Sequence, residues 1–265
     1  MAAASNHMRA ATHAIILAAG RGSRMGATTA MAPKCLTMLG GKALLAWQLA
    51  ALRSAGIQSI IVVGGYRKDM LKSEAYQLLD NPNWANTNMV ASLRCASTLL
   101  RAAPCLVSYA DILYHPDRVK ALAVADADIA ISYDTDWEPL WRARFDNPLA
   151  DAETFRQKDG WLVTIGERAE RVSDIEGQYT GLLKFTPTGW TQVEQLVSSL
   201  SPEVQAGIDM TNLLRGLLGR GVKIRCLPSA GAWCEVDDVA DLRLYQRLLN
   251  DSDENGNRWR HDWRW

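Results

Sequence analysis

The feature that most constrains the fold is a short apolar run at residues 14–18 that ends in a glycine-rich segment. An apolar run of this length, bounded by glycines, is typical of a strand buried in a parallel sheet. Apolar residues at helical spacing follow at 43–53, and a second, β-branched run at 59–63 ends at Gly64. Strand, helix and strand in that order predict a β-α-β unit.

The same alternation continues along the chain. Strands are expected at 105–110 and 129–133, and helices at about 90–100 and 117–124. This alternation predicts an α/β fold with a doubly wound, mostly parallel sheet, whose ligands lie beyond the carboxyl ends of the strands. Later segments complete the body, with strands expected at 179–185, 222–227 and 233–236 and helices at 189–200, 210–218 and 239–249.

Composition divides the chain into three parts. Residues 1–12 are expected to form a disordered leader, and residues 13–249 the main domain. Within that domain the alternation breaks at about 134–180 into aromatic, charged and Pro-containing sequence, which indicates a small inserted lobe with one strand near 161–165. Residues 250–265 form a tail with three tryptophans in its last seven residues, which could dock on the body, dock on a second subunit of a homodimer, or fray.

Charge and cysteine content argue against several classes of protein. Lys plus Arg and Asp plus Glu number 29 each, so the chain lacks the basic excess of a protein that binds nucleic acid. The five cysteines are odd in number and lack C-x-x-C spacing, which favours reduced thiols in the cytoplasm over a disulfide framework or a thiolate zinc site. The apolar run at 14–19 is too short for a signal sequence or a membrane span.

The segment after the first strand has the composition of a phosphate loop. It reads L-A-A-G-R-G-S-R-M-G at 17–26 and is followed by Pro33 and Lys34. Gly20 and Gly22 let backbone N–H groups approach phosphate oxygens, and Arg24 and Lys34 supply the positive charge that a triphosphate requires. Strand, glycine loop and paired cations predict a triphosphate site in which Lys34 and Arg24 are the catalytic residues.

Other known phosphate motifs fit this segment poorly. A Walker loop ends in G-K-S or G-K-T, which is absent here. A dinucleotide fingerprint needs a third glycine where Met25 stands, and an acidic residue at the end of the second strand, where Val63 and Gly64 stand. A glycine-rich turn without a ligand is the plain alternative, and the ordered set of two glycines and two cations argues against it.

Two aspartates follow strands on the side where ligands are expected. Asp111 ends the strand at 105–110, and Asp237 follows the strand at 233–236. Oxygen ligands beside a phosphate are what Mg²⁺ prefers, so the pair predicts a magnesium site. Either residue alone could be a surface carboxylate, and Asp237 or Asp238 could cap the helix expected from residue 239.

The loop L-A-A-G-x-G-S-R-M followed by P-K-x-L resembles the signature of the nucleotidyltransferase superfamily, which includes sugar-1-phosphate nucleotidyltransferases and bacterial phosphocholine and phosphonate cytidylyltransferases. The match extends through G-K-x-L-L at 41–45, V-V-x-G-Y at 62–66 and W-C-E-V-D-D at 233–238. The resemblance implies a Rossmann-like fold and a metal held by Asp111 and Asp237. It also implies nucleotide binding by Leu17, Ala18, Ala19, Gly20, Gly22, Ser23, Arg24, Gly65, Tyr66 and Ala110.

A second segment, N-T-N-M-V-A-S-L at 86–93, is similar to the N-x-x-x-S-L stretch of the phosphocholine and phosphonate cytidylyltransferases. The similarity implies that Asn88 and Ser92 lie near the nucleotide. A short amide, a hydroxyl and backbone groups can read the compact edge of a pyrimidine. Asn88 as an ordinary helix N-cap is an equally good interpretation.

The inserted lobe is dense in Trp, Asp and Arg, as D-T-D-W-E-P-L-W-R-A-R at 134–144 shows. Arginines could clamp the phosphate of an acceptor, and aromatic and acidic side chains could receive a cationic head group. The opposing interpretation has the tryptophans packing the lobe and the arginines pairing with its acids. The residues expected to bind the acceptor are Asp136, Trp137, Trp141, Arg142, Arg144, Tyr179 and Glu235.

These patterns predict a magnesium-dependent cytidylyltransferase that transfers CMP from CTP to a small phosphonate or phosphomonoester and releases pyrophosphate. Phosphocholine, aminoethylphosphonate and hydroxyalkylphosphonates are the acceptor types expected. Because the acceptor oxygen is already anionic, positioning and charge neutralisation suffice without a Ser-His or Cys-His pair. The alternatives are a sugar-1-phosphate nucleotidyltransferase using another nucleoside triphosphate and a non-catalytic nucleotide-sensing module, and the intact Lys34, Asp111 and Asp237 argue against the module.

Overall fold

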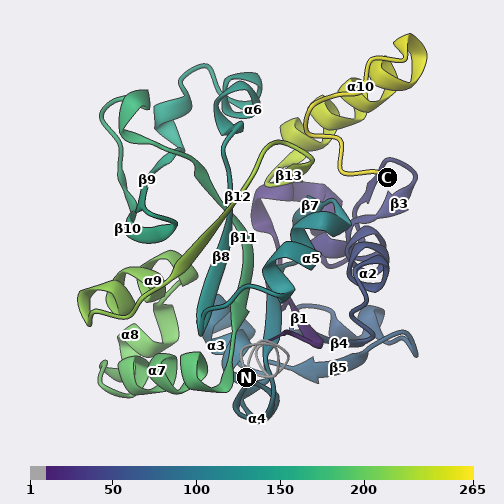
Figure 1. Cartoon of the computed structure of the whole chain (residues 1–265). Coiled ribbons are helices and arrows are strands. Elements are labelled where there is room, and N and C mark those ends of the chain that lie inside the picture. The colour runs from purple at the N-terminus through teal and green to yellow at the C-terminus, as the bar shows by residue number, and fades with distance from the viewer. Residues whose placement is uncertain (1–9) are drawn as a thin grey trace.

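A nine-stranded sheet forms the centre of the computed structural model, which describes residues 10–265 (Figure 1). Residues 1–9, most of the expected leader, lie outside the described residues. The strand order is β5-β4-β1-β6-β11-β8-β12-β10-β9. The strands are β1 (His13–Ala18), β4 (Ser59–Gly64), β5 (Gln77–Asp80), β6 (Cys105–Tyr109), β8 (Ile129–Asp134), β9 (Glu153–Lys158), β10 (Trp161–Arg168), β11 (Gln178–Phe185) and β12 (Arg225–Ser229).

Most strands in this sheet run in the same direction, although only four of its eight strand pairs are parallel, because β10 and β11 run opposite to the other strands. β1 lies parallel to β4 and β6, β4 to β5, and β8 to β12, whereas β11 runs antiparallel between β6 and β8. The predicted mostly parallel α/β sheet is therefore confirmed. Two short ladders lie outside it and join β2 (Met38–Leu39) to β3 (Lys42–Ala43) and β7 (Ile112–Tyr114) to β13 (Trp233–Glu235).

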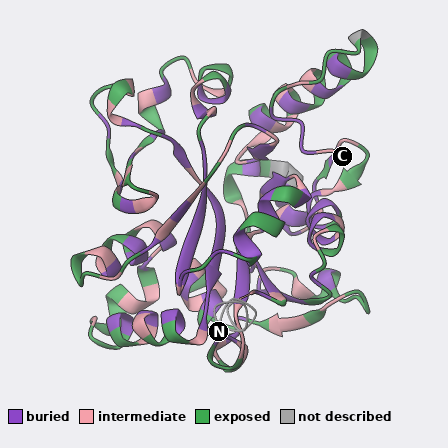
Figure 2. Cartoon of the chain, in the orientation of Figure 1, coloured by how far each residue is buried: buried purple, intermediate pink, exposed green. Residues whose placement is uncertain are grey.

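Helices cover both faces of the sheet. Successive side chains of a strand point to opposite faces, so Ile16 of β1 packs in one hydrophobic cluster and Ile15 in the other. Figure 2 shows the central strands β8 and β11 almost wholly buried between these layers. The first cluster includes α2 (Leu44–Ser54), α5 (Pro116–Ala123), α6 (Trp137–Arg144) and α10 (Val239–Asn255). The second includes α3 (Met89–Arg94), α4 (Ser97–Ala102), α7 (Pro187–Ser198) and α9 (Met210–Gly219), and the short α8 (Pro202–Gly207) connects α7 to α9.

Several element boundaries differ from those expected from the sequence. The helix expected at 90–100 is two helices, α3 and α4. β12 starts at Arg225 rather than at 222, and α10 continues to Asn255, beyond the boundary expected at 249. β5, β9 and α6 occupy segments in which no element was expected. Their sequences mix polar and apolar residues without a clean period, so periodicity alone could not find them.

The segment expected to form an inserted lobe continues the edge of the main sheet. β9 and β10 pair antiparallel, and β10 joins β12 through Trp161 and Arg225. The buried face of α6, with Trp137 and Trp141, packs in the same hydrophobic cluster as residues of α10. The lobe therefore shares both the sheet and the core of the main domain.

The C-terminal residues pack against the body of the same chain. Trp263 is fully buried and meets the ring of Trp47 edge-on, with centroids 6.0 Å apart. Trp259 stacks on Tyr245 of α10 at 5.3 Å. In Figure 1 the C-terminus lies beside β3 and α2. Among the helices at 10–265, none combines the length and the apolar character that crossing a bilayer requires.

Replacing Trp263 with Ala should lower the free energy of unfolding by about 3–5 kcal/mol, because the change removes a fully buried indole and leaves a cavity against Trp47. Urea denaturation followed by far-UV circular dichroism measures the effect. Trp265→Ala is the matched control, since Trp265 is 52% exposed, and it should cost less than about 1 kcal/mol. Equal stability of the two variants would show that the C-terminal residues do not belong to the folded body.

Candidate active site

The glycine loop leaves β1 and turns back over the carboxyl end of the sheet. Gly22 has a φ of +66°, and a Cβ atom there would lie 2.8 Å from Cβ of Lys34, so only glycine fits. The hydroxyl of Thr29 donates to the Gly22 carbonyl at 2.8 Å, and the side chain of Met25 is fully buried beneath the loop. The loop is therefore shaped by its contact with Lys34 before any ligand binds.

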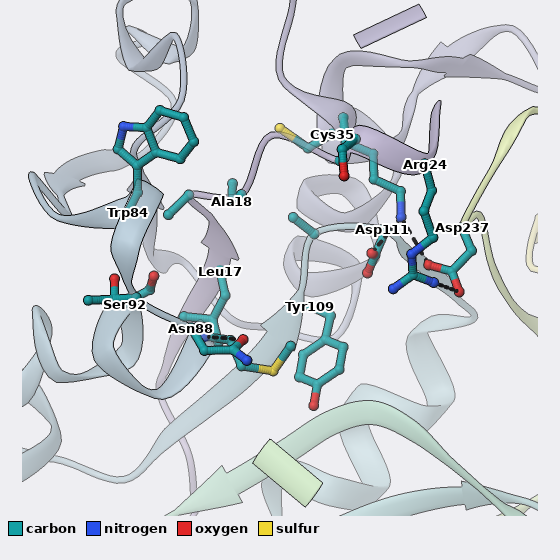
Figure 3. A pocket seen from close by; sticks show the side chains of 18 residues that line it. Leu17, Ala18, Arg24, Cys35, Trp84, Asn88, Ser92, Tyr109, Asp111 and Asp237 are labelled. Carbon is teal, nitrogen blue, oxygen red and sulfur yellow. Dashed lines mark hydrogen bonds and ion pairs between the residues drawn. The ribbon is translucent and has the colours of Figure 1, made fainter. Parts of the chain in front are cut away.

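A cavity of about 310 Å³ opens between this loop, the end of β6 and the start of α3. Figure 3 shows that its two ends differ, with charged side chains at one end and Trp84, Asn88 and Ser92 at the other. The lining residues are Leu17, Ala18, Ala19, Gly20, Gly22, Ser23, Arg24, Lys34, Cys35, Trp84, Thr87, Asn88, Met89, Ser92, Tyr109, Ala110, Asp111 and Asp237. The structure thus brings Lys34, Arg24, both predicted metal ligands and most of the predicted nucleotide-binding residues to one cavity.

The charged end is a network of two cations and two carboxylates. Lys34 Nζ donates to Asp111 Oδ2 at 2.8 Å and to Asp237 Oδ1 at 3.3 Å, and Arg24 donates to Asp237 Oδ2 at 2.9 Å. Burial lowers the pKa of Lys34, but the carboxylates of Asp111 and Asp237 raise it by more, so its pKa lies above the ordinary value. The ammonium therefore stays charged at neutral pH. Gln48, buried on α2, donates to the carbonyls of Tyr109 and Ile112 and so fixes the turn that carries Asp111.

A third carboxyl group, that of Glu235, completes an acidic cluster. Oxygen atoms of Asp111, Glu235 and Asp237 all lie within 4.8 Å of one another. Burial, together with the charges of Asp111 and Asp237, raises the pKa of Glu235 well above its ordinary value. A hard divalent cation prefers such an all-oxygen ligand set, and its charge would favour the ionised form of this carboxyl group. These residues therefore fit Mg²⁺, and Glu235, expected to touch the acceptor, lies in the same acidic cluster as Asp111 and Asp237.

A buried arginine holds the backbone of this cluster. Arg144 donates to both oxygens of Asp241, at 2.8 and 2.9 Å, and its guanidinium lies 3.7 Å from Asp237 Oδ2. Asp241 in turn accepts the backbone N–H of Asp237 at 2.8 Å. Asp238 caps α10 by accepting the N–H of Asp241. Of the two aspartates considered as the cap, Asp238 is therefore the one that caps, while Asp237 faces the cavity.

The other end of the cavity carries short polar side chains. Asn88 is the N-cap of α3, with Oδ1 accepting the N–H of Met89 at 2.7 Å. Ser92 Oγ accepts a hydrogen bond from Asn81 Nδ2 at 3.0 Å. Asn88 therefore caps α3, and because its side chain also lines the cavity (Figure 3), a contact with a nucleotide stays a prediction compatible with the cap.

Gly65 and Tyr66 do not line the cavity and instead support it from behind. The backbone N–H of Tyr66 donates to the carbonyl of Ala19 at 2.9 Å, and its ring meets Trp84 edge-on at 5.3 Å. A Cβ atom on Gly65 would lie 2.5 Å from the side chain of Trp84. These two residues hold the loop and the indole in place.

A second cavity, of about 220 Å³, adjoins the first, and Arg24, Tyr109 and Asp237 line both. Tyr109 stands between them, with its ring edge-on to Tyr179 at 5.9 Å. Gly181 makes room for it, because a Cβ atom there would lie 2.7 Å from Tyr109 Cδ2. The other lining residues are Ile112, Trp141, Asp151, Glu153, Gln178, Tyr179, Thr180, Gly181, Thr211 and Glu235.

Three of the residues expected to bind the acceptor line this second cavity, namely Trp141, Tyr179 and Glu235. The other four do not, and they are bonded elsewhere. Arg142 pairs with Glu138 on the surface of α6, and Arg144 is buried against Asp241. Asp136 pairs with Arg260, and Trp137 is buried beside Trp141. For these four residues the structure shows the packing and pairing roles that were the alternative interpretation.

The structure adds residues that sequence reasoning missed. Cys35, Trp84, Thr87, Met89 and Tyr109 line the first cavity, and Asp151, Glu153, Gln178 and Thr211 line the second. Tyr109 could have been found from the sequence, because it ends the strand that leads to Asp111 and so lies at the edge of the sheet where ligands are expected. The sequence pattern gave no indication of the residues of the second cavity, because they come from the loop before β9, from β9, β11 and α9, and only the fold brings them together.

Replacing Asp241 with Asn should lower the free energy of unfolding by about 3 kcal/mol, because the buried Arg144 loses its charged partner and Asp237 loses part of its backbone support. Glu138→Gln, which breaks the exposed pair with Arg142 on the same helix as Arg144, should cost less than about 1 kcal/mol. Urea denaturation of both variants measures the difference. Equal losses would show that the Arg144–Asp241 pair is no stronger than a surface ion pair.

Comparison with known proteins agrees with this geometry. Residues 14–168 match the model of the MobA-like NTP transferase domain. The chain is 35% identical over 248 residues to the CTP:phosphoglutamine cytidylyltransferase of Campylobacter jejuni, a match that covers 88% of this chain and 98% of that protein.

Solved structures share the fold at low sequence identity. The inositol-1-phosphate CTP transferase from T. maritima superimposes with a TM-score of 0.73 at 20% identity, over 92% of this chain and 97% of that one. The CTP:phosphocholine cytidylyltransferase from Streptococcus pneumoniae superimposes with a TM-score of 0.68 at 20% identity, over 89% and 98%. The resemblance found in the sequence is confirmed, and the chain belongs to the MobA-like NTP transferase family and is a nucleotidyltransferase.

Proposed function

We propose that the protein is a magnesium-dependent cytidylyltransferase that joins CMP, taken from CTP, to a small phosphorylated acceptor carrying a primary ammonium group. The observation that carries the proposal is the pair of adjoining cavities. The first has a cationic and acidic end beside a glycine loop and a small polar end at Asn88 and Ser92, and the second is lined by carboxylates. The Campylobacter relative, which acts on CTP, supports the choice of nucleotide.

The residues of the first cavity suit in-line attack by the acceptor on the α-phosphorus of the nucleotide. Lys34 and Arg24 are placed to neutralise charge on the phosphates, and the loop amides after Ala19 are placed to bind the departing pyrophosphate. Asp111, Glu235 and Asp237 would hold the magnesium ion, which when bound neutralises further charge on the phosphates. The acceptor oxygen is anionic, so these groups act by positioning and charge and need not remove a proton.

The small polar end fits a pyrimidine. Asn88 and Ser92 present an amide and a hydroxyl to the cavity, and Trp84 supplies an aromatic surface at the same end (Figure 3). Donors and acceptors of this size can read the edge of a cytosine ring. Asn81 holds the Ser92 hydroxyl at 3.0 Å, which fixes its direction.

The second cavity favours a cation that can donate hydrogen bonds. Asp151, Glu153 and Glu235 line it, and Trp141 Nε1 donates to Asp151 Oδ2 at 3.0 Å, which orients that carboxylate. A quaternary ammonium group binds best inside an aromatic box, and Trp137, one of the rings expected there, is buried away from this cavity. A primary ammonium group suits the carboxylates better. Phosphoglutamine, the acceptor in the name of the Campylobacter relative, is the first candidate.

The direct test is pyrophosphate release with magnesium, each of the common nucleoside triphosphates and a panel of acceptors. The panel contains phosphoglutamine, aminoethylphosphonate, phosphocholine, hydroxyethylphosphonate, glycerol phosphate and glucose-1-phosphate. We expect turnover with CTP and the highest kcat/KM for acceptors with a primary ammonium group. Turnover with glucose-1-phosphate alone would overturn the proposed acceptor, and turnover with another triphosphate alone would overturn the proposed nucleotide.

Replacing Lys34 with Ala should lower kcat by about 10²–10³-fold, because a fixed cation beside the reacting phosphates is lost. Steady-state pyrophosphate release measures the loss. Lys120→Ala, which removes an exposed lysine paired with Asp117 on α5, is the control and should keep the activity of the unchanged protein. A Lys34→Ala variant with near-normal kcat would remove the basis of the proposed phosphate site.

Replacing Asp151 with Asn together with Glu153 with Gln should raise KM for an ammonium-bearing acceptor by about tenfold or more, because charged hydrogen bonds to the ammonium are lost. KM for CTP should stay within about twofold, since neither residue lines the first cavity. Hydroxyethylphosphonate serves as the uncharged comparison. Equal effects on both acceptors would show that these carboxylates do not recognise the ammonium.

A further inference from the structure

A fully buried carboxylate, that of Asp134, lies outside the two cavities at the end of β8. Its Oδ1 accepts the backbone N–H groups of Asp136, at 3.0 Å, and of Gly231, at 2.9 Å. Its Oδ2 lies 3.1 Å from Nε2 of His261, and the guanidinium of Arg118 lies 3.7 Å from Oδ1. One carboxylate thus joins β8, the loop before β13 and the C-terminal segment, residues 257–265.

The backbone of the C-terminal segment also forms a hydrogen bond with the loop before β13. The carbonyl of Arg260 accepts the N–H of Ala232 at 2.8 Å, and the carbonyl of Ala232 accepts the N–H of His115 at 3.1 Å. Arg118 donates to the carbonyl of Gly231. The loop at 230–232 is therefore hydrogen-bonded on both sides, by the C-terminal segment and by the start of α5.

These hydrogen bonds stabilise a backbone conformation with positive φ angles in the loop at 230–232. Gly231 has a φ of +61° and Ala232 a φ of +51°, both in the left-handed region, which disfavours alanine. The approach of the two segments is close, because a Cβ atom on Gly231 would lie 2.3 Å from the carbonyl oxygen of Arg260. Strained residues of this kind persist only where the surroundings fix them.

The strained loop leads directly into the strand that carries the acidic cluster. β13 starts at Trp233 and ends at Glu235, and the next N–H, that of Val236, donates to the carbonyl of Asp111 at 2.9 Å. Asp237 follows one residue later. The loop at 230–232 therefore sets where β13 begins, and β13 sets the positions of Glu235 and Asp237 relative to Asp111.

We propose that two residues of the C-terminal segment, Arg260 through its carbonyl and His261 through its ring, help to position the acidic cluster for nucleotidyl transfer, with His261 as a positioning residue. His261 and the Arg260 carbonyl fix the loop before β13 and so hold two of the three carboxylates in place for the metal ion. The segment touches neither cavity, and its effect passes through Asp134 and the loop. Activity with CTP, as proposed above, serves only as one readout of this role.

The test compares His261→Phe with His261→Gln. Phenylalanine keeps the buried bulk but removes the hydrogen bond to Asp134, whereas the glutamine amide can still donate to it. The Phe variant should lose about tenfold in kcat and need about tenfold more Mg²⁺ for half-maximal rate, while KM for CTP changes less than about twofold. This is the low end of the range for losing a direct partner of a metal ligand, because His261 acts on the ligands through Asp134 and the loop. Glutamine should restore most of the loss.

Direct binding of Mn²⁺, followed by electron paramagnetic resonance, reports on the cluster without turnover. It should weaken about tenfold in the Phe variant, and it separates this proposal from the proposed substrates, because it does not depend on them. Trp265→Ala, a change in the same segment at a half-exposed side chain, is the control and should leave kcat and Mn²⁺ binding unchanged.

Unchanged kcat and Mn²⁺ binding in a folded His261→Phe variant would overturn the proposal. If the Phe variant does not fold, Asp134→Asn provides the second measurement, since it keeps an acceptor oxygen for the two backbone N–H groups but loses the charge that faces His261 and Arg118. Full activity and full Mn²⁺ affinity in that variant would overturn the proposal equally. Equal losses in Trp265→Ala and His261→Phe would assign the segment a general stabilising role.

Discussion

Mutual repulsion among Asp111, Glu235 and Asp237 is the constraint around which the rest of the site is arranged. Three carboxyl groups within 4.8 Å of one another cannot all be charged without compensation. Lys34 and Arg24 at the cavity and the buried guanidinium of Arg144 behind Asp237 compensate the charge, and the pKa of Glu235 is raised, which favours its neutral form. These compensating cations come from the glycine loop, the turn that starts at Lys34, and α6, so the charge balance links distant parts of the chain at one site.

Much of the fold could be predicted because its central strands are continuous apolar runs. β1, β4, β6 and β8 are buried on both faces, and a short β-branched run between glycines or acidic residues is a strong signal. β9 and α6 could not be found in the same way. One face of β9 is open to solvent, and α6 owes its burial to partners such as α10 that lie far along the chain. The period of apolar residues in a sequence reflects which side chains are buried. In β9 and α6, tertiary contacts decide which side chains are buried, so the period alone does not reveal these elements.

The candidate site also contains residues that local sequence reveals and residues that only tertiary contacts bring together. Gly20, Gly22, Arg24 and Lys34 could be grouped from sequence because a phosphate loop is local and its spacing is meaningful. The role of Arg144 could not be inferred, because an arginine in an aromatic, acidic segment looks the same whether it binds a ligand or a buried aspartate. Asp241, the partner that decides the matter, lies on a different helix. The second cavity likewise could not be predicted from the sequence, since Asp151 and Thr211 line it together only in the folded chain.

The position of β9 at the edge of the sheet has a consequence for how such enzymes diverge. An edge strand has one neighbour, so changes in its sequence disturb few other contacts, whereas β1 and β6 are fixed on both sides. Mutations that reshape Asp151 or Glu153 can therefore accumulate while the phosphate loop and the acidic cluster stay as they are. With the acceptor bound in the second cavity, as proposed, a chain built in this way can exchange one small phosphorylated acceptor for another while the residues around the nucleotide stay the same.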